Sequence, residues 1–222
     1  YGFHYVQLGI LVGINFTAQV TSDIIFSGAI DKIGFKKLVL PANICAFVGL
    51  LLFGLSPYIF GKEHIFTGLI ISTVIFSAAS GLLEVLLSPI INAIPGDDKG
   101  PAMSMMHSFY AWGQAAVIII TTLFVFLFGG ENFQIIVLLW AIIPLVNFIM
   151  FLNAPFPDTI PEEHRQTLKD LIFKPFYLIA LGAIFFGAAT EIVINQWSST
   201  FLEKALELPK ITGDLLGMCG FA

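Results

Sequence analysis

Acidic and imidazole side chains stand inside long apolar runs of this sequence. Glu84 and Glu191 each interrupt a hydrophobic stretch, and His107 stands in a third. An ionisable group is costly within the hydrocarbon region of a membrane, so such groups usually mark a path for a solute or a proton. A carboxyl group removed from water favours its neutral form, which suits it to carry a proton near neutral pH. We therefore expect proton coupling at Glu84 first, with Glu191 second and His107 as partner of Glu84; a fixed structural role is the alternative.

Amide and indole side chains accompany these groups. Asn15, Gln19 and Asp23 follow one another at intervals of four, which places them on one face of a helix. Amides can bind solute hydroxyls, and an indole ring can stack on the apolar face of a sugar. Hydrogen bonding between helices is an equal alternative for the amides, and anchoring at the membrane interface competes for Trp197. The candidate solute-binding residues are Asn15, Gln19, Asn92, Trp112, Gln114, Asn195, Gln196 and Trp197.

The composition places these residues in a membrane protein. The chain is 57% hydrophobic and 11% charged, whereas soluble globular chains are about 25% charged. So few polar residues cannot cover a surface that faces water. The net charge of −5 says little about a nucleic-acid partner, but the sequence has no long basic patch to bind one. Cys45 and Cys219 both lie in apolar runs and indicate inert, buried thiols rather than a disulfide framework or a metal site.

Six stretches are apolar enough to cross a bilayer, which takes about 20 residues. They predict an all-α integral membrane protein, a helical bundle with six complete transmembrane helices and the start of a seventh near Leu215. The polar, proline-containing loop predicts a division into an N-terminal bundle (1–152), a cytoplasmic loop between bundles (153–172) and the start of a C-terminal bundle (173–222). The six stretches are 5–29, 38–60, 65–94, 102–128, 133–152 and 173–202.

The loops between these stretches alternate in charge. Seven of the ten lysines and arginines lie on one side and three on the other, and loops rich in basic residues stay in the cytoplasm. We expect a multi-pass protein of the cytoplasmic membrane whose first stretch runs from outside to inside, as though one span before Tyr1 were missing. The cytoplasmic loops are 31–37, 95–101 and 153–174, and the opposite loops are 61–64, 129–132 and 203–214.

The first cytoplasmic loop reads GAIDKIGFKK. Gly28 would let a neighbouring helix approach, Asp31 would face the positive end of another helix, and Gly34 would permit a tight turn. The lysines would hold the loop in the cytoplasm. We expect this loop to gate a conformational change, with a generic basic turn as the alternative. The residues concerned are Gly28, Asp31, Lys32, Gly34, Lys36 and Lys37.

This loop resembles the signature of the major facilitator superfamily, which follows the second span of each half. The resemblance implies that the chain covers helices two to seven and the start of the eighth. The segments GLLEVLLSPIINAIP, MMHSFYAWGQ and EIVINQWSSTFLEKAL look like the sugar-transporter branch related to the fucose permeases. That branch has an acidic residue and an Asn in its fourth helix, a His opening its fifth and an acidic residue in its seventh. The matching positions are Glu84, Asn92, His107 and Glu191.

The sequence therefore predicts a secondary transporter that moves a small polar solute by proton symport and alternating access around a midplane site. The expected partners are a solute, a sugar first, together with protons and the lipid bilayer, and we expect a monomer. A polyol, nucleoside or drug remains open as the solute. An enzyme with Glu84 and His107 as acid and base, or a non-transporting receptor, is the alternative from another class. No phosphate-binding loop is present, so ATP is not the expected energy source, and we expect no cofactor or metal.

Overall fold

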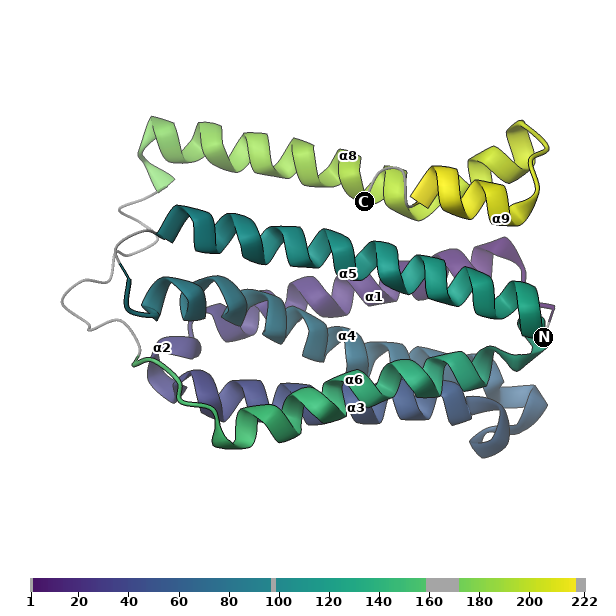
Figure 1. Ribbon diagram of the computed structural model, residues 1–222, viewed down its shortest axis with the longest axis horizontal. Coiled ribbons are helices and arrows are strands. Elements are labelled where there is room, and N and C mark those ends of the chain that lie inside the picture. The colour runs from purple at the N-terminus through teal and green to yellow at the C-terminus, as the bar shows by residue number, and fades with distance from the viewer. Residues whose placement is uncertain (1, 97–98, 159–171, 219–222) are drawn as a thin grey trace. The chain divides into compact units, whose positions relative to one another are not determined.

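The computed structural model describes residues 2–96, 99–158 and 172–218, and over these residues the fold is all-helical (Figure 1). Six helices are long and apolar enough to cross a membrane, which confirms the predicted fold class. Leucine, isoleucine and phenylalanine dominate them, so their outer faces can meet lipid without exposing the backbone hydrogen bonds. The six are α1 (Tyr5–Ser27), α3 (Phe35–Ile59), α4 (Gly61–Ala93), α5 (Lys99–Phe128), α6 (Phe133–Asn153) and α8 (Pro175–Ala205).

The loops are shorter than the sequence predicted because the helices continue into them. Residues 61–64, expected to form a loop, are the first turn of α4. Gly61 makes the bend with φ +67°, and Glu63 in that turn complements the positive end of the helix dipole. The remaining connections hold short helical turns, which are α2 (Ile30–Ile33), η1 (Gly130–Asn132), α9 (Lys210–Gly213) and the π-helical turn η3 (Asp214–Met218).

The first compact unit comprises Tyr1–Met103 and Glu131–Ile160. Within it α4 packs against both α1 and α3, and α3 also packs against α6. Its contacts with both α1 and α3 make α4 a central helix of this unit.

Polar side chains inside these helices form hydrogen bonds with carbonyl groups of the preceding turn. Ser72 donates to the carbonyl of Gly68, and Asn43 donates to that of Val39.

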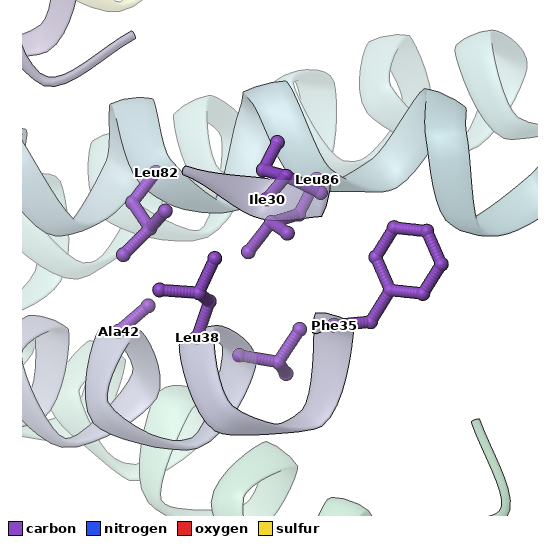
Figure 2. Packing of buried hydrophobic residues seen from close by; sticks show 7 residues of the cluster. Ile30, Phe35, Leu38, Ala42, Leu82 and Leu86 are labelled. Atoms are coloured by element: carbon purple, nitrogen blue, oxygen red, sulfur yellow. The ribbon is translucent and has the colours of Figure 1, made fainter. Parts of the chain in front are cut away.

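An apolar cluster joins α4 to α3 near the GAIDKIGFKK loop (Figure 2). Leu82 and Leu86 of α4 point toward Leu38 and Ala42 of α3, and Leu86 is 0% exposed. Successive residues of a helix are 100° apart, so Glu84, two residues from each leucine, faces away from α3. The cluster is completed by Ile30, Phe35 and Val39.

The second compact unit comprises Ser104–Gly130 and Pro161–Ala222. In it α8 packs against α9 and η3. The fit is close, because a methyl carbon on Gly217 would lie 2.9 Å from the backbone nitrogen of Ser199. α5 also belongs to this unit, apart from its first residues.

The structure describes one of the two cysteines and only part of the loop at 153–172. Cys45 was expected to be buried, and this was wrong, since it lies exposed on α3; an apolar face of a spanning helix can turn outward to lipid. Cys219 lies outside the described residues, as do 159–171, which hold most of the loop at 153–172. The division into two bundles at that loop stays a prediction.

Candidate functional site

The helices α1 and α4 are in tight contact at Gly81. A methyl carbon on Gly81 would lie 2.5 Å from the backbone oxygen of Gln19 and 2.7 Å from Asp23 Oδ1. Real methyl carbons essentially never approach another heavy atom to under 3.0 Å. Only glycine therefore fits here, and this contact brings the α1 backbone directly onto α4.

Polar side chains line this contact on both helices. Gln19 Nε2 of α1 donates a hydrogen bond to Glu84 Oε2 of α4. Ser77 Oγ of α4 donates to Asn15 Oδ1 at 2.5 Å, and Ser22 Oγ donates to the carbonyl of Ala78 at 2.6 Å. Asn15 bonds to Ser77, and Gln19, later in α1, bonds to Glu84, later in α4. This order is the one expected for two parallel helices. We call this group the α1–α4 seam, and it comprises Asn15, Gln19, Asp23, Ser77, Gly81 and Glu84.

Asp23 adds a second carboxyl group to the seam. Its Oδ1 is buried, and no hydrogen-bond partner for it is found among the described residues. Two carboxyl groups at one helix contact, one of them bonded to an amide, make a site that can hold a proton or accept hydrogen bonds from hydroxyl groups.

The seam can be reached from outside the unit. Glu84 is exposed in the structure, and Asn15 and Gln19 are half-buried. The helix contact at Gly81 covers part of the α1 side, while the Glu84 residue remains exposed. The arrangement therefore combines a fixed hydrogen-bond partner with an accessible acidic group.

The other predicted residues of α4 and α5 are mostly exposed. Asn92 is exposed and stands one residue before the end of α4. On α5, His107 is exposed and Gln114 is half-buried. Trp112 is 67% exposed and meets the ring of Phe109 edge-on, with centroids 5.5 Å apart. His107, the expected partner of Glu84, belongs to the second unit; in the first unit Glu84 takes its hydrogen bond from Gln19.

On α8 the predicted residues gather along one helix. Thr190, Glu191 and, one turn later, Asn195 line a hollow on α8. Asn195 is 9% exposed, and its Oδ1 has no hydrogen-bond partner among the described residues. Gln196 and Trp197 are exposed. This helix therefore offers one buried, unsatisfied amide oxygen beside an acidic group.

The GAIDKIGFKK loop is built differently from its predicted form at one position. Gly34 has φ +91°, which confirms the predicted tight turn. Gly28 was expected to admit a neighbouring helix; among the described residues a methyl carbon there would meet nothing within 4 Å, so no close approach at Gly28 is seen within the first unit. Gly28 instead follows α1 as its C-cap, and the close approach occurs at Gly81.

The lysine side of this loop is anchored to α6. Lys36 Nζ donates to the carbonyl of Leu152 at 2.7 Å and lies 3.5 Å from that of Ala154. A cation at the C-terminal carbonyls of a helix complements the helix dipole. Asp31 lies in the first turn of α2, and Lys32 and Lys37 are exposed. Lys36 thus ties the start of α3 to the end of α6.

Sequence reasoning missed three residues of the α1–α4 contact: Ser77 and Gly81 of the seam, and Ser22 beside it. A signal was present on α4, because Ser77, Gly81 and Glu84 are spaced by four and three and share one helical face. Small residues on a face that also carries a carboxyl group indicate a helix contact with polar groups inside it. Ser22 has no such signal, since its partner is a backbone carbonyl.

Comparison with known proteins gives one match. The family model described as Major Facilitator Superfamily matches residues 1–222. Searches of curated proteins and of solved structures found no match. The match covers every element described above, including the helices of both units.

Proposed function

The chain belongs to the Major Facilitator Superfamily, and from this membership we propose that it takes up a small polar solute, a sugar first, by proton symport. The superfamily consists of secondary transporters that carry small-molecule solutes across membranes. The protein is accordingly an integral, multi-pass membrane protein of that class. Beyond this class, we propose that the coupling ion is the proton, that the solute is a sugar and that the protein lies in the cytoplasmic membrane.

The observation that carries the proposal is the hydrogen bond from Gln19 to Glu84 across the seam. Placing an acidic group within a spanning helix costs free energy, and such groups usually belong to a path for a solute or a proton. Here it faces an amide, and no lysine or arginine stands in the interior of a predicted span. A carboxyl group with a neutral partner can lose its charge without leaving a cation unpaired, which is what a proton carrier requires.

The same bond suggests how protonation and solute binding are coupled. Ionised Glu84 accepts the amide hydrogen of Gln19 strongly, because hydrogen bonds to charged acceptors are about twice as strong as neutral ones. When Glu84 takes up a proton, this pull weakens and the amide of Gln19 becomes available to a solute hydroxyl. Proton binding then favours solute binding, and by linkage solute binding favours proton binding to the same extent.

The solute class rests on the chemistry of the amides and on the sequence resemblance. Asn15 and Gln19 provide donors and acceptors that match sugar hydroxyls, beside the carboxyl groups of Asp23 and Glu84. The resemblance of the Glu84, Asn92 and Glu191 segments to the fucose permease branch supports a sugar. The proposed solute-binding set further includes residues from α4, α5 and α8, which are Asn92, Trp112, Gln114, Asn195, Gln196 and Trp197.

Transport by the full-length protein in liposomes tests the proposal. An inward proton gradient should drive accumulation of a labelled sugar, measured against a panel of polyols and nucleosides. Glu84→Gln keeps the shape and an acceptor for Gln19 but cannot bind a proton. We expect this variant to lose gradient-driven accumulation while retaining counterflow exchange.

Glu63→Gln is the matched control, because Glu63 is an exposed acidic residue in the first turn of the same helix. It should transport as the unchanged protein does. Full accumulation by the Glu84→Gln variant would refute proton coupling at Glu84, and accumulation of a nucleoside in place of every sugar would refute the solute class.

A further inference from the structure

A buried carboxylate outside the seam joins three elements of the second unit. Asp214, the first residue of η3, is 6% exposed. Thr122 Oγ1 of α5 donates a hydrogen bond to Asp214 Oδ2 at 3.1 Å, and Ser199 Oγ of α8 donates to Oδ1. Both oxygens of one carboxylate are therefore engaged, each by a hydroxyl from a different helix.

These hydroxyls matter more than the neighbouring cation. Lys210 Nζ lies 3.6 Å from Asp214 Oδ1, but the lysine side chain is 66% exposed, and ion pairs that reach water contribute little. A buried carboxylate is destabilising unless hydrogen bonds satisfy it. The hydrogen bonds from Thr122 and Ser199 are therefore the main interactions that stabilise the buried carboxylate of Asp214.

The two sides of this carboxylate are packed very differently. On the α8 side the contact is backbone to backbone: a methyl carbon on Gly213 would lie 3.0 Å from the Ser199 carbonyl oxygen, and one on Gly217 is excluded as described above. On the α5 side a cavity of about 400 Å³ separates the helix from the turn, lined by Val117, Val125 and Ile211 among others. No residue of α5 is buried in the part of the chain that the structure describes.

We propose that the hydrogen bond between Thr122 and Asp214 is a releasable joint between α5 and the α8–η3 segment. Close packing fixes Asp214 to α8, so the joint opens on its α5 side, where one polar bond spans loosely packed surfaces. Its role rests on the proposed function. Alternating access requires the two bundles to part on one face at a time, and α5 belongs to the first predicted bundle while α8 begins the second.

The loop charges place this joint on the face opposite the lysine-rich loops. Asp214 ends the 203–214 loop, which belongs to the less basic set, and Thr122 stands six residues before the end of α5. The joint therefore closes the non-cytoplasmic face. It breaks when that face opens and re-forms when it shuts.

Distances between spin labels on the two sides of the joint test this directly. The labels are attached to cysteines at Leu127 and Leu206, both exposed, in the full-length protein carrying Cys45→Ala and Cys219→Ala. Thr122→Val removes the donor at constant shape. We expect it to raise the ratio of long to short distances roughly ten- to a hundredfold, as the loss of one hydrogen bond to a charged group predicts.

Ser108→Ala is the matched control, because the Ser108 hydroxyl donates to Ser104 within α5; it should leave the distances unchanged. A Thr122→Val distribution equal to that of Ser108→Ala would overturn the proposal. The proposal would also be overturned if Asp214→Asn lengthened the distances while Thr122→Val did not, since Asp214 would then stabilise only its own turn. If Asp214→Asn fails to fold, Thr122→Val decides. No solute is needed, so a failure of sugar or proton transport leaves this result standing.

Discussion

Replacing Gly81 with alanine should separate α1 from α4. The added methyl carbon would lie 2.5 Å from the Gln19 backbone oxygen, whereas ordinary contact begins at 3.4 Å, so the helices must part by about 0.9 Å (3.4 − 2.5). The obstacle is backbone, which cannot rotate away. Inserting a methyl group into a tight contact costs about 1–3 kcal/mol.

The hydrogen bonds of the seam add a smaller part to this cost. Hydrogen bonds between spanning helices contribute about 0.6 kcal/mol each, and a separation of this size lengthens the bonds that Gln19 and Asn15 make with α4. For a domain of this size, each kcal/mol lowers the melting temperature by about 2–4 °C. Relative to an alanine at an uncrowded helical glycine, which has the same gain in helix propensity, the packing cost predicts a decrease of roughly 2–12 °C for Gly81→Ala.

The assay is thermal unfolding of the purified protein in detergent, with Gly13→Ala as the matched control. Gly13 lies in α1, and a methyl carbon there would meet nothing within 4 Å. Alanine is favoured over glycine in a helix by about 1 kcal/mol, so this control should be neutral or stabilising. A Gly81→Ala protein that melts with or above the Gly13→Ala protein would refute the close helix contact, and with it the geometry of the seam.

Two further predictions concern the GAIDKIGFKK loop. Lys36→Met removes the donor to the Leu152 carbonyl, so hydrogen exchange at the start of α3 should rise roughly three- to tenfold, the effect of one net hydrogen bond. The exposed neighbour Lys37→Met should leave it unchanged, and equal exchange in both variants would show that Lys36 anchors nothing. In a cysteine-free protein, a cysteine at Lys36 should resist impermeant thiol reagents in intact cells while one at Lys62 reacts; the reverse pattern would invert the predicted topology.

The helical architecture could be predicted from the sequence because apolar length alone decides which segments can span a bilayer. The helix ends were less predictable. Residues 61–64 are polar and looked like a loop, yet they continue α4, since a polar first turn can extend past the hydrocarbon region and still keep its hydrogen bonds.

The candidate site was predicted in part. The spacing of Asn15 and Gln19 showed that they share a face, and Glu84 was singled out by its charge. That Gln19 meets Glu84 could not be predicted, because periodicity fixes the face of a helix but not its partner or its register. Asp214 was missed for a different reason. It stood in an apparent loop, and its burial depends on Thr122 and Ser199 from segments distant in sequence.

The packing of α4 also indicates which part of the seam can move. Leu82 and Leu86 hold one side of α4 against α3, and Gly81 holds α1 against α4 with no spare space. Neither helix can shift at Glu84 without breaking one of these contacts. The side chain of Gln19 is therefore the part of the seam that could move without disturbing either contact, and its departure would take this hydrogen bond from Glu84. Protonation of Glu84 would then act first on this amide, and helix movement would follow from solute binding rather than precede it.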